Sequence, residues 1–235
     1  MSAKGPEEYL ISRIITSAFL VNGSQPFRYR FSSAGEPCLR ALVYDAFDHD
    51  DGLQPAIGNG KLKWNLSAVC GTAVGERIEA GAKAIGLLTQ QAHEFDTGAV
   101  RVKGSSDIVA PDAIIDIKLV GEKKWSKIEK KPDPKHVLQV NGYAVSADKP
   151  RWILFYIRAC SIFDDAPELE YRLHAGDANI EMAQELCGVW EQVDSHRKLR
   201  TLPERMFEAA PNKFPCGWCR HQSRCLTNSP EEGAP

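Results

Sequence analysis

Two aspartates and a lysine are spaced so that they could form one hydrolytic centre. The run Gly104-Ser-Ser-Asp107 is followed nine residues later by Asp116-Ile-Lys118. Residues two apart in a strand project from the same face, so Asp116 and Lys118 would lie side by side. A turn through Pro111-Asp112 would bring Asp107 next to them. The spacing therefore predicts two carboxylates and an ammonium group at one place.

The chemistry expected of this trio is hydrolysis assisted by a divalent cation. Converging carboxylates are costly without a cation to balance them, and hard oxygen ligands suit Mg²⁺ or Mn²⁺. Such a cation lowers the pKa of a bound water, and Lys118 would orient that water or stabilise the developing negative charge. A bare Asp-x-Lys is also an ordinary pattern of exposed strand residues, so the flanking pattern decides between the two interpretations.

A glutamine and a tyrosine extend the pattern. Gln139 and Tyr143 are four residues apart in a stretch expected to be helical, so they share one helix face. The ordered set of Gly-x-x-Asp, an apolar strand, Asp-x-Lys and Gln-x-x-x-Tyr resembles the PD-(D/E)XK nuclease superfamily. Specifically, it resembles the RecB-like branch, which includes the CRISPR-associated exonucleases and AddB-type nuclease domains. The resemblance covers residues 36–225.

The resemblance implies a fold and a role for each residue. The fold would be α/β (α+β), a restriction-endonuclease-like core with a small mixed sheet flanked by helices. Asp107 and Asp116 would bind Mg²⁺ or Mn²⁺ together with the backbone carbonyl of Ile117. Lys118 would serve the hydrolytic step, and the Gln-x-x-x-Tyr pair would organise DNA and the active site.

The activity that the resemblance implies is metal-dependent DNA hydrolysis, with removal of nucleotides from single-stranded ends favoured over internal cutting. A non-catalytic DNA-binding subunit of a larger repair, recombination or CRISPR complex is the alternative from another functional class. With 235 residues the chain is too short to carry a helicase motor as well. A helicase, integrase or recombination partner would therefore be a separate chain.

One position departs from the branch. A Gly-x-x-x-His helix usually supplies a further metal ligand there, but this chain has Gly75 in place of the histidine. Glu76 and Glu79 follow, and other nucleases of the superfamily use a helical glutamate. We favour Glu76 as the ligand, with Glu79 as its substitute. If neither reaches the metal, weak or absent activity is expected.

Three cysteines near the C-terminus have metal-ligand spacing. Cys216, Cys219 and Cys225 form C-x2-C-x5-C, and a closed site needs a fourth ligand. By spacing alone, His221 would complete a zinc knuckle. The resemblance instead implies Cys38 and a structural [4Fe–4S] cluster that joins the two ends of the domain. The remaining cysteines have apolar neighbours and are predicted to be small core residues: Cys70, Cys160 and Cys187.

The overall charge does not by itself indicate a nucleic-acid partner. There are 29 Lys and Arg against 31 Asp and Glu, for a net charge of −2, whereas nucleic-acid-binding domains often have a basic excess. The local distribution matters more. Lys123, Lys124 and Lys127 surround Trp125 and could contact phosphates and stack a base, although a solvated face is an equal alternative.

The order of expected elements favours an α/β or α+β fold with a mixed sheet. Helices are predicted over 6–20, 36–47, 66–87, 136–146 and 177–198, and strands over 99–109, 113–120, 151–159 and 168–174. We expect an N-terminal helical segment (1–35), a nuclease domain (36–228) that includes the cluster-binding segment (203–228), and a disordered tail (229–235). No secretory signal or membrane-length apolar run is evident, so an intracellular, cytoplasmic protein is expected, in which cysteines serve metal or core.

Overall fold

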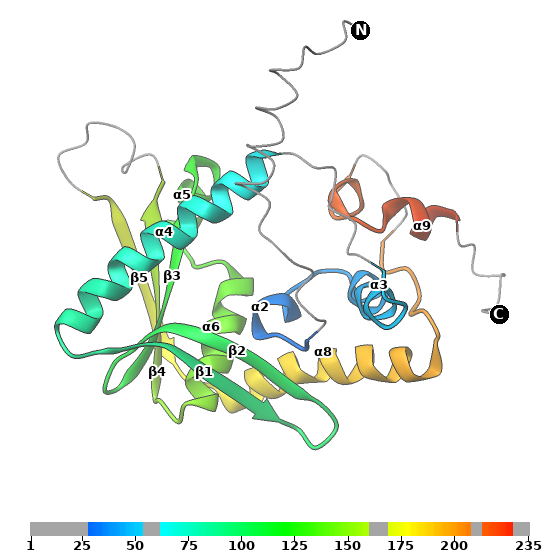
Figure 1. Ribbon diagram of the computed structural model, residues 1–235, viewed down its shortest axis with the longest axis horizontal. Coiled ribbons are helices and arrows are strands. Elements are labelled where there is room, and N and C mark those ends of the chain that lie inside the picture. Colours follow the sequence, from blue (N-terminus) through cyan, green and yellow to red (C-terminus); the bar gives the residue numbers. More distant parts are fainter. Residues whose placement is uncertain (1–27, 54–61, 160–168, 208–212, 228–235) are drawn as a thin grey trace, which may run out of the picture.

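A five-stranded mixed sheet in the order β1-β2-β3-β4-β5 carries the fold (Figure 1). The computed structural model describes residues 28–53, 62–159, 169–207 and 213–227, apart from the side chains of 62–68 and 218. The strands are β1 (Leu88–Asp96), β2 (Arg101–Val109), β3 (Ala113–Val120), β4 (Arg151–Arg158) and β5 (Tyr171–Asp177). The helices are α2 (Phe31–Ala34), α3 (Leu39–Asp50), α4 (Leu62–Ala84), α5 (Glu122–Ile128), α6 (Pro134–Ser146), α8 (Ile180–Leu199), the short 3-10 turn η2 (Cys216–Trp218) and α9 (Gln222–Thr227).

The sheet opens between its second and third strands. β1 and β2 pair antiparallel from end to end except at Gln90, whereas β2 and β3 pair only at Ile108↔Ile115 and Val109↔Ile114. β3 then pairs with β4 in parallel over its full length, and β4 pairs antiparallel with β5. The parallel pair requires a crossover, which α5 and α6 provide. On the side of β3 that faces β2, the backbone groups beyond Ile115 therefore have no neighbouring strand to pair with.

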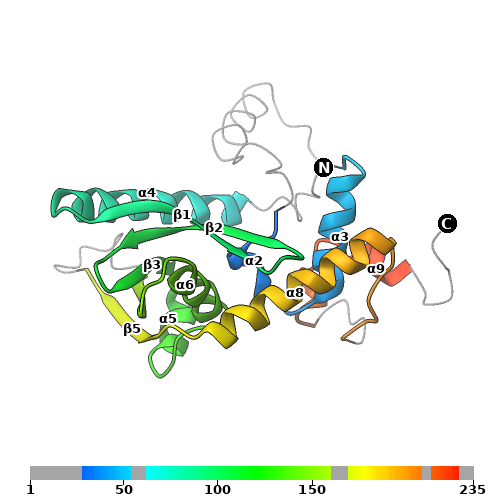
Figure 2. The ribbon, with the colours of Figure 1, turned by 90° about the horizontal axis from the view of Figure 1, so that it is seen from below.

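Helices lie on both faces of the sheet. α6 packs against β1 to β4 on one face, and α4 crosses β1, β2 and β3 on the other (Figure 2). α8 packs against α6 and α3, which extends the body beyond the sheet. The side chains of the candidate site come from the strand opening, α4 and α6, so both helical layers are needed to position them.

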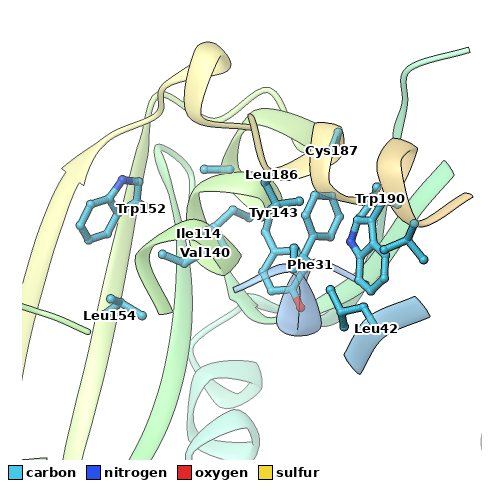
Figure 3. Packing of buried hydrophobic residues seen from close by; sticks show 14 of the residues in the cluster. Phe31, Leu42, Ile114, Val140, Tyr143, Trp152, Leu154, Leu186, Cys187 and Trp190 are labelled. Carbon is cyan, nitrogen blue, oxygen red and sulfur yellow. The ribbon is translucent and has the colours of Figure 1, made fainter. Parts of the chain in front are cut away.

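The core begins with α2 and joins it to α6 and α8 (Figure 3). Phe31 is fully buried and meets the Tyr143 ring edge-on, with 5.1 Å between ring centroids. Trp190 of α8 is also buried, and its indole N–H donates a 3.1 Å hydrogen bond to the carbonyl of Arg30. The Phe31 ring thus packs directly against Tyr143 of α6.

The predicted fold class is confirmed, with differences in particular elements. The strand β1 was missed, since residues 88–96 fell between a predicted helix and strand. The last strand runs from Tyr171 to Asp177 rather than over 168–174, and α3 begins at Leu39 rather than at 36. The predicted helix over 6–20 lies outside the described residues, as does the tail 229–235. No described helix is both long and apolar enough to cross a membrane.

Candidate active site

Asp116 stands at the centre of a linked set of polar side chains. It is 2% exposed, and Lys118 Nζ lies 2.7 Å from its Oδ2. Lys118 Nζ also donates to Gln139 Oε1 at 3.1 Å, and Gln139 Nε2 donates to the Tyr143 hydroxyl at 3.0 Å. The predicted strand pair and helix pair therefore meet, and β3 and α6 supply one continuous chain of contacts.

The Asp116 carboxylate is under-satisfied. Its contact with Lys118 is an ion pair without hydrogen-bond alignment, so buried Oδ2 has no aligned donor among the described residues. Burial raises the pKa of Asp116, and the Lys118 charge opposes that shift. A buried acceptor of this kind costs free energy unless a further positive group meets it.

Asp107 occupies the gap where β2 leaves β3. Its Oδ2 accepts a 2.6 Å hydrogen bond from the backbone N–H of Ile117, a residue beyond the last β2–β3 pair. Burial, followed by the negative charge of Asp116, raises the pKa of Asp107 to about 6. The two carboxylates therefore repel one another at a position where both are largely shielded from water.

The donor chemistry fits a hard divalent cation. Two desolvated carboxylates with raised pKa values, one with an oxygen free of aligned donors, would both be stabilised by Mg²⁺ or Mn²⁺. Within the described residues, however, no three His, Cys, Asp or Glu side chains are drawn together tightly enough to hold a metal ion. The ligands are of the right kind, and side-chain adjustment would have to accompany binding.

The acid that α4 brings to this centre is Glu79. Glu76, the glutamate preferred in the sequence analysis, is exposed on α4, whereas Glu79, its substitute there, is 7% exposed, so the structure favours Glu79. Glu79 Oε1 accepts a 2.6 Å hydrogen bond from Gln90 Nε2, and that nitrogen lies 3.5 Å from Asp107 Oδ1. A Cβ atom on Gly75 would lie 3.9 Å from Glu79 Oε1. Long helical side chains lean toward the preceding turn, so Glu79 covers the position where the branch has histidine.

Gly104 lets Tyr143 approach the sheet. A Cβ atom at residue 104 would lie 2.6 Å from Tyr143 Cε1 and 2.8 Å from its hydroxyl, distances that a side chain cannot tolerate. Burial raises the pKa of Tyr143 above its usual range, so the phenol stays neutral at ordinary pH. The close packing against Tyr143 therefore explains why the Gly-x-x-Asp motif begins with a glycine.

Two residues near the centre were missed by the sequence analysis. His93 stacks at 5.6 Å from the Tyr143 ring, and its Nε2 lies 2.7 Å from Ser106 Oγ. Gln90 bridges the acids as described above. Both residues belong to β1, the strand that the sequence pattern did not predict, and a strand assignment there would have placed them opposite Gly104 and Asp107.

The predicted lysine segment forms a basic pocket at the start of α6. The pocket has a volume of about 470 Å³, and Lys123, Lys124, Lys127 and Lys131 all line it. Lys124 Nζ lies 2.6 Å from Asp133 Oδ2 and 3.0 Å from His136 Nε2. The other lysine side chains in the pocket are exposed.

Trp125 differs from the expectation of an exposed stacking residue. Its side chain is 6% exposed, and the guanidinium of Arg172 lies 4.1 Å above its ring. Arg172 also donates to the Trp125 carbonyl at 2.6 Å. The indole is a core group with its outer face already covered, so it is not available to a base.

The four cysteines assigned to the cluster line one pocket of about 230 Å³. Burial raises the pKa of Cys38, and the neighbouring Cys225 and Cys216 charges add to that effect. The pKa of Cys219 is raised by burial and by the other three thiols. None of the four forms a disulfide with another described cysteine. Of the predicted core cysteines, Cys187 is buried, Cys70 is half-buried and Cys160 lies outside the described residues.

His221 lines the same pocket, but carboxylates of α3 already contact its ring. It is 5% exposed, with Nε2 2.6 Å from Asp45 Oδ1 and Nδ1 3.6 Å from Asp48 Oδ2. Arg220 pairs with Asp45 and Arg224 with Asp48, so the tail is fixed to α3 by charged contacts. Both ring nitrogens of His221 face carboxylates, which disfavours the histidine as a fourth ligand beside the thiols.

The sheet order, the opening between β2 and β3 and the helices on both faces define a mixed α/β fold that the chain shares with solved structures. The structure of SSO0001 has a TM-score of 0.52 to this chain at 13% identity and covers 94% of this chain and 96% of its own. The alkaline exonuclease LHK-Exo from Laribacter hongkongensis has a TM-score of 0.52 at 13% identity, covering 80% and 95%. Its complex with dAMP gives a TM-score of 0.51 at 14% identity, covering 74% and 89%. No family model and no curated protein sequence matches the chain. At these identities the similarity establishes the fold alone.

Proposed function

We propose that the chain is a metal-dependent deoxyribonuclease that removes nucleotides from DNA ends, with single-stranded ends preferred. The observation that carries the proposal is the buried Asp116 carboxylate, linked through Lys118 and Gln139 to Tyr143 and lacking an aligned donor at Oδ2. The shared fold with LHK-Exo, an alkaline exonuclease, supports the exonuclease class. The RecB-like assignment stays a prediction.

Each residue has a role that follows from its position. Asp107, Asp116 and the Ile117 carbonyl would hold Mg²⁺ or Mn²⁺, with Glu79 rather than Glu76 as the α4 acid. The bound cation supplies an acidified water and charge stabilisation at the phosphate. Lys118, held by Gln139 at 3.1 Å, donates to the attacking water or the developing oxyanion.

DNA is the proposed substrate, and the basic pocket is its proposed phosphate contact. Lys123 and Lys127 are exposed, and the pocket opens at the start of the helix that carries Gln139. Positive side chains beside the centre would guide a strand toward Asp116. Trp125 is left out of this role because it is buried. A helicase, integrase or recombination partner stays a prediction.

The test is a nuclease assay with end-labelled single-stranded DNA, Mn²⁺ or Mg²⁺, and anaerobically purified protein. We expect progressive shortening that EDTA and Asp116→Ala abolish. Closed circular single-stranded DNA, run in parallel, should stay intact, and its degradation would indicate an endonuclease. DNA binding without any cutting, unchanged by Asp116→Ala, would instead support the non-catalytic subunit.

We also infer that the four cysteines hold a [4Fe–4S] cluster with a structural role. Their thiols line one pocket, and His221 is occupied by Asp45 and Asp48. Among the described residues the thiols are not drawn together to ligand geometry, so cluster binding would tighten the pocket. The test is iron, sulfide and zinc content after anaerobic purification, with the visible spectrum. Stoichiometric zinc in colourless protein would exclude the cluster, and loss of colour in Cys38→Ser would support the fourth ligand.

A further inference from the structure

Gln90 has an unusual backbone for its place in the fold. Three described non-glycine residues have positive φ: Gln90 at 50°, Asp148 at 51° and Arg200 at 54°. Arg200 is the C-cap of α8 and Asp148 follows the C-cap of α6, which are ordinary places for a left-handed residue. Gln90 instead lies inside β1, where extended backbone is the rule. Left-handed residues without such a reason are strained and concentrate at functional sites.

The strain occurs where the β1–β2 ladder faces Asp107. Thr89 pairs with Ile108 and Gln91 pairs with Ser106, so Gln90 stands opposite Asp107 without a regular pairing. Its Nε2 lies 2.6 Å from Glu79 Oε1 and 3.5 Å from Asp107 Oδ1. An amide NH₂ group has two N–H donors, one for each carboxylate.

Glu79 depends on this contact. Its side chain is buried, and among the described residues Gln90 is its hydrogen-bond donor. A buried carboxylate without a donor costs free energy, which favours its turning toward solvent. Gln90 therefore connects the α4 acid to the strand acid.

We propose that Gln90 is a positioning residue that braces Glu79 against Asp107, so that the acid of α4 is in place before a divalent cation arrives. In this proposal the left-handed backbone of Gln90 directs its side-chain amide toward both carboxylates. This inference rests on the proposed function, in which these acids hold the cation. Gln90 itself acts through Glu79 and is not assigned as a metal ligand.

The test measures Mn²⁺ affinity of the full chain by titration calorimetry, without DNA. Gln90→Gly keeps the left-handed backbone free of strain and removes the amide, and Gln90→Asn tolerates this backbone but is one methylene shorter. We expect both to lower Mn²⁺ affinity by on the order of tenfold, the range for partners that orient metal ligands. Gln91→Asn is the matched control, because the Gln91 amide donates to the Thr89 carbonyl instead, and its affinity should equal that of the unaltered chain.

Thermal unfolding without metal separates positioning from structure. Gln90→Gly should change the unfolding temperature little, since relief of the strained backbone offsets the loss of the Glu79 hydrogen bond. Its loss of Mn²⁺ affinity should vanish in a Glu79→Gln background, because residues that act as a unit are not additive.

Three results would overturn the proposal: unchanged affinity in Gln90→Gly, tighter Mn²⁺ binding because the amide competes with the cation, or equal losses with and without Glu79. The readout is independent of catalysis. If the unaltered chain binds Mn²⁺ in a Gln90-dependent way but cuts no DNA, the proposed function fails and the Gln90 inference stands. If the unaltered chain cuts DNA and Gln90→Gly binds Mn²⁺ normally, the proposed function stands and the Gln90 inference fails.

Discussion

The Asp107 carboxylate caps the backbone N–H of Ile117 at 2.6 Å, in the place where a neighbouring strand would otherwise supply the acceptor. The side chain thereby fills the opening between β2 and β3 and is held next to Asp116. One hydrogen bond thus links the shape of the sheet to the placement of an acid.

The raised pKa of Asp107 predicts a pH-dependent stability in metal-free protein. Because its pKa moves from 3.8 to about 6 on folding, the folded state favours the protonated form. The stability present below pH 4 is then lost as pH rises through 6, on the order of 3 kcal/mol. Asp107→Asn should be more stable than the unaltered chain at pH 8 and equal to it near pH 3.5, measured by urea unfolding in EDTA. Equal stability at both pH values would contradict the shift.

Removing Lys118 should lower the stability of the fold, because the buried Asp116 charge loses its partner. Lys118→Met leaves a carboxylate that is 2% exposed without its ammonium partner, and breaking such a pair costs about 3 kcal/mol. The double variant Asp116→Asn, Lys118→Met should recover most of that loss in denaturant unfolding with EDTA. Additive losses would show that the pair is not coupled.

Gly104→Ala should displace Tyr143. The added methyl group would lie 2.6 Å from the ring, and overpacking of this kind costs about 1–3 kcal/mol. We also expect reduced DNA cleavage, because the Gln139–Tyr143 contact moves with the ring. Gly121→Ala is the control, since no atom lies within 4 Å of its added Cβ. Equal behaviour of the two variants in unfolding and cleavage would count against this packing role.

Lys127→Ala should weaken DNA binding through charge alone. Removing one phosphate contact lowers the slope of log affinity against log salt by about 0.7 for single strands. Binding should fall similarly for different sequences, measured by fluorescence anisotropy from low to moderate salt. Lys198→Ala, on α8 and paired with Asp194, should leave the slope unchanged. An unchanged slope in Lys127→Ala would remove the pocket from the interface.

The side-by-side placement within the Asp-x-Lys pair and within the Gln-x-x-x-Tyr pair could be predicted because each pair lies within one regular element, whereas the meeting of the two pairs was implied only by the resemblance. Strand alternation places Asp116 beside Lys118, and helical spacing places Gln139 beside Tyr143. Choosing between Glu76 and Glu79 was not possible in this way. Small residues surround both in the sequence of α4, so no clean apolar stripe identifies the face turned to the sheet.

The missed strand and the misjudged tryptophan have physical reasons. Thr89 and His93 turn inward from β1, so the strand lacks the apolar alternation that marks a buried face. The polar lining of a site thus hides the element that carries it. Trp125 and Ile128 are buried one turn apart on the short helix α5. Because the residues around them are mostly lysines, the sequence shows only these two apolar positions, too few to identify a buried face.

The attachment of the tail to α3 bears on the order in which this protein completes its structure during synthesis. Buried Arg40 donates to the Pro203 carbonyl at 2.8 Å, and Asp45 and Asp48 receive their partners from Arg220, His221 and Arg224. A nascent chain leaves the ribosome from its N-terminus, at about 5–20 residues per second. α3 therefore emerges before the five strands, and its partners in the tail emerge after them, so these contacts can form only once the whole sheet has been synthesised.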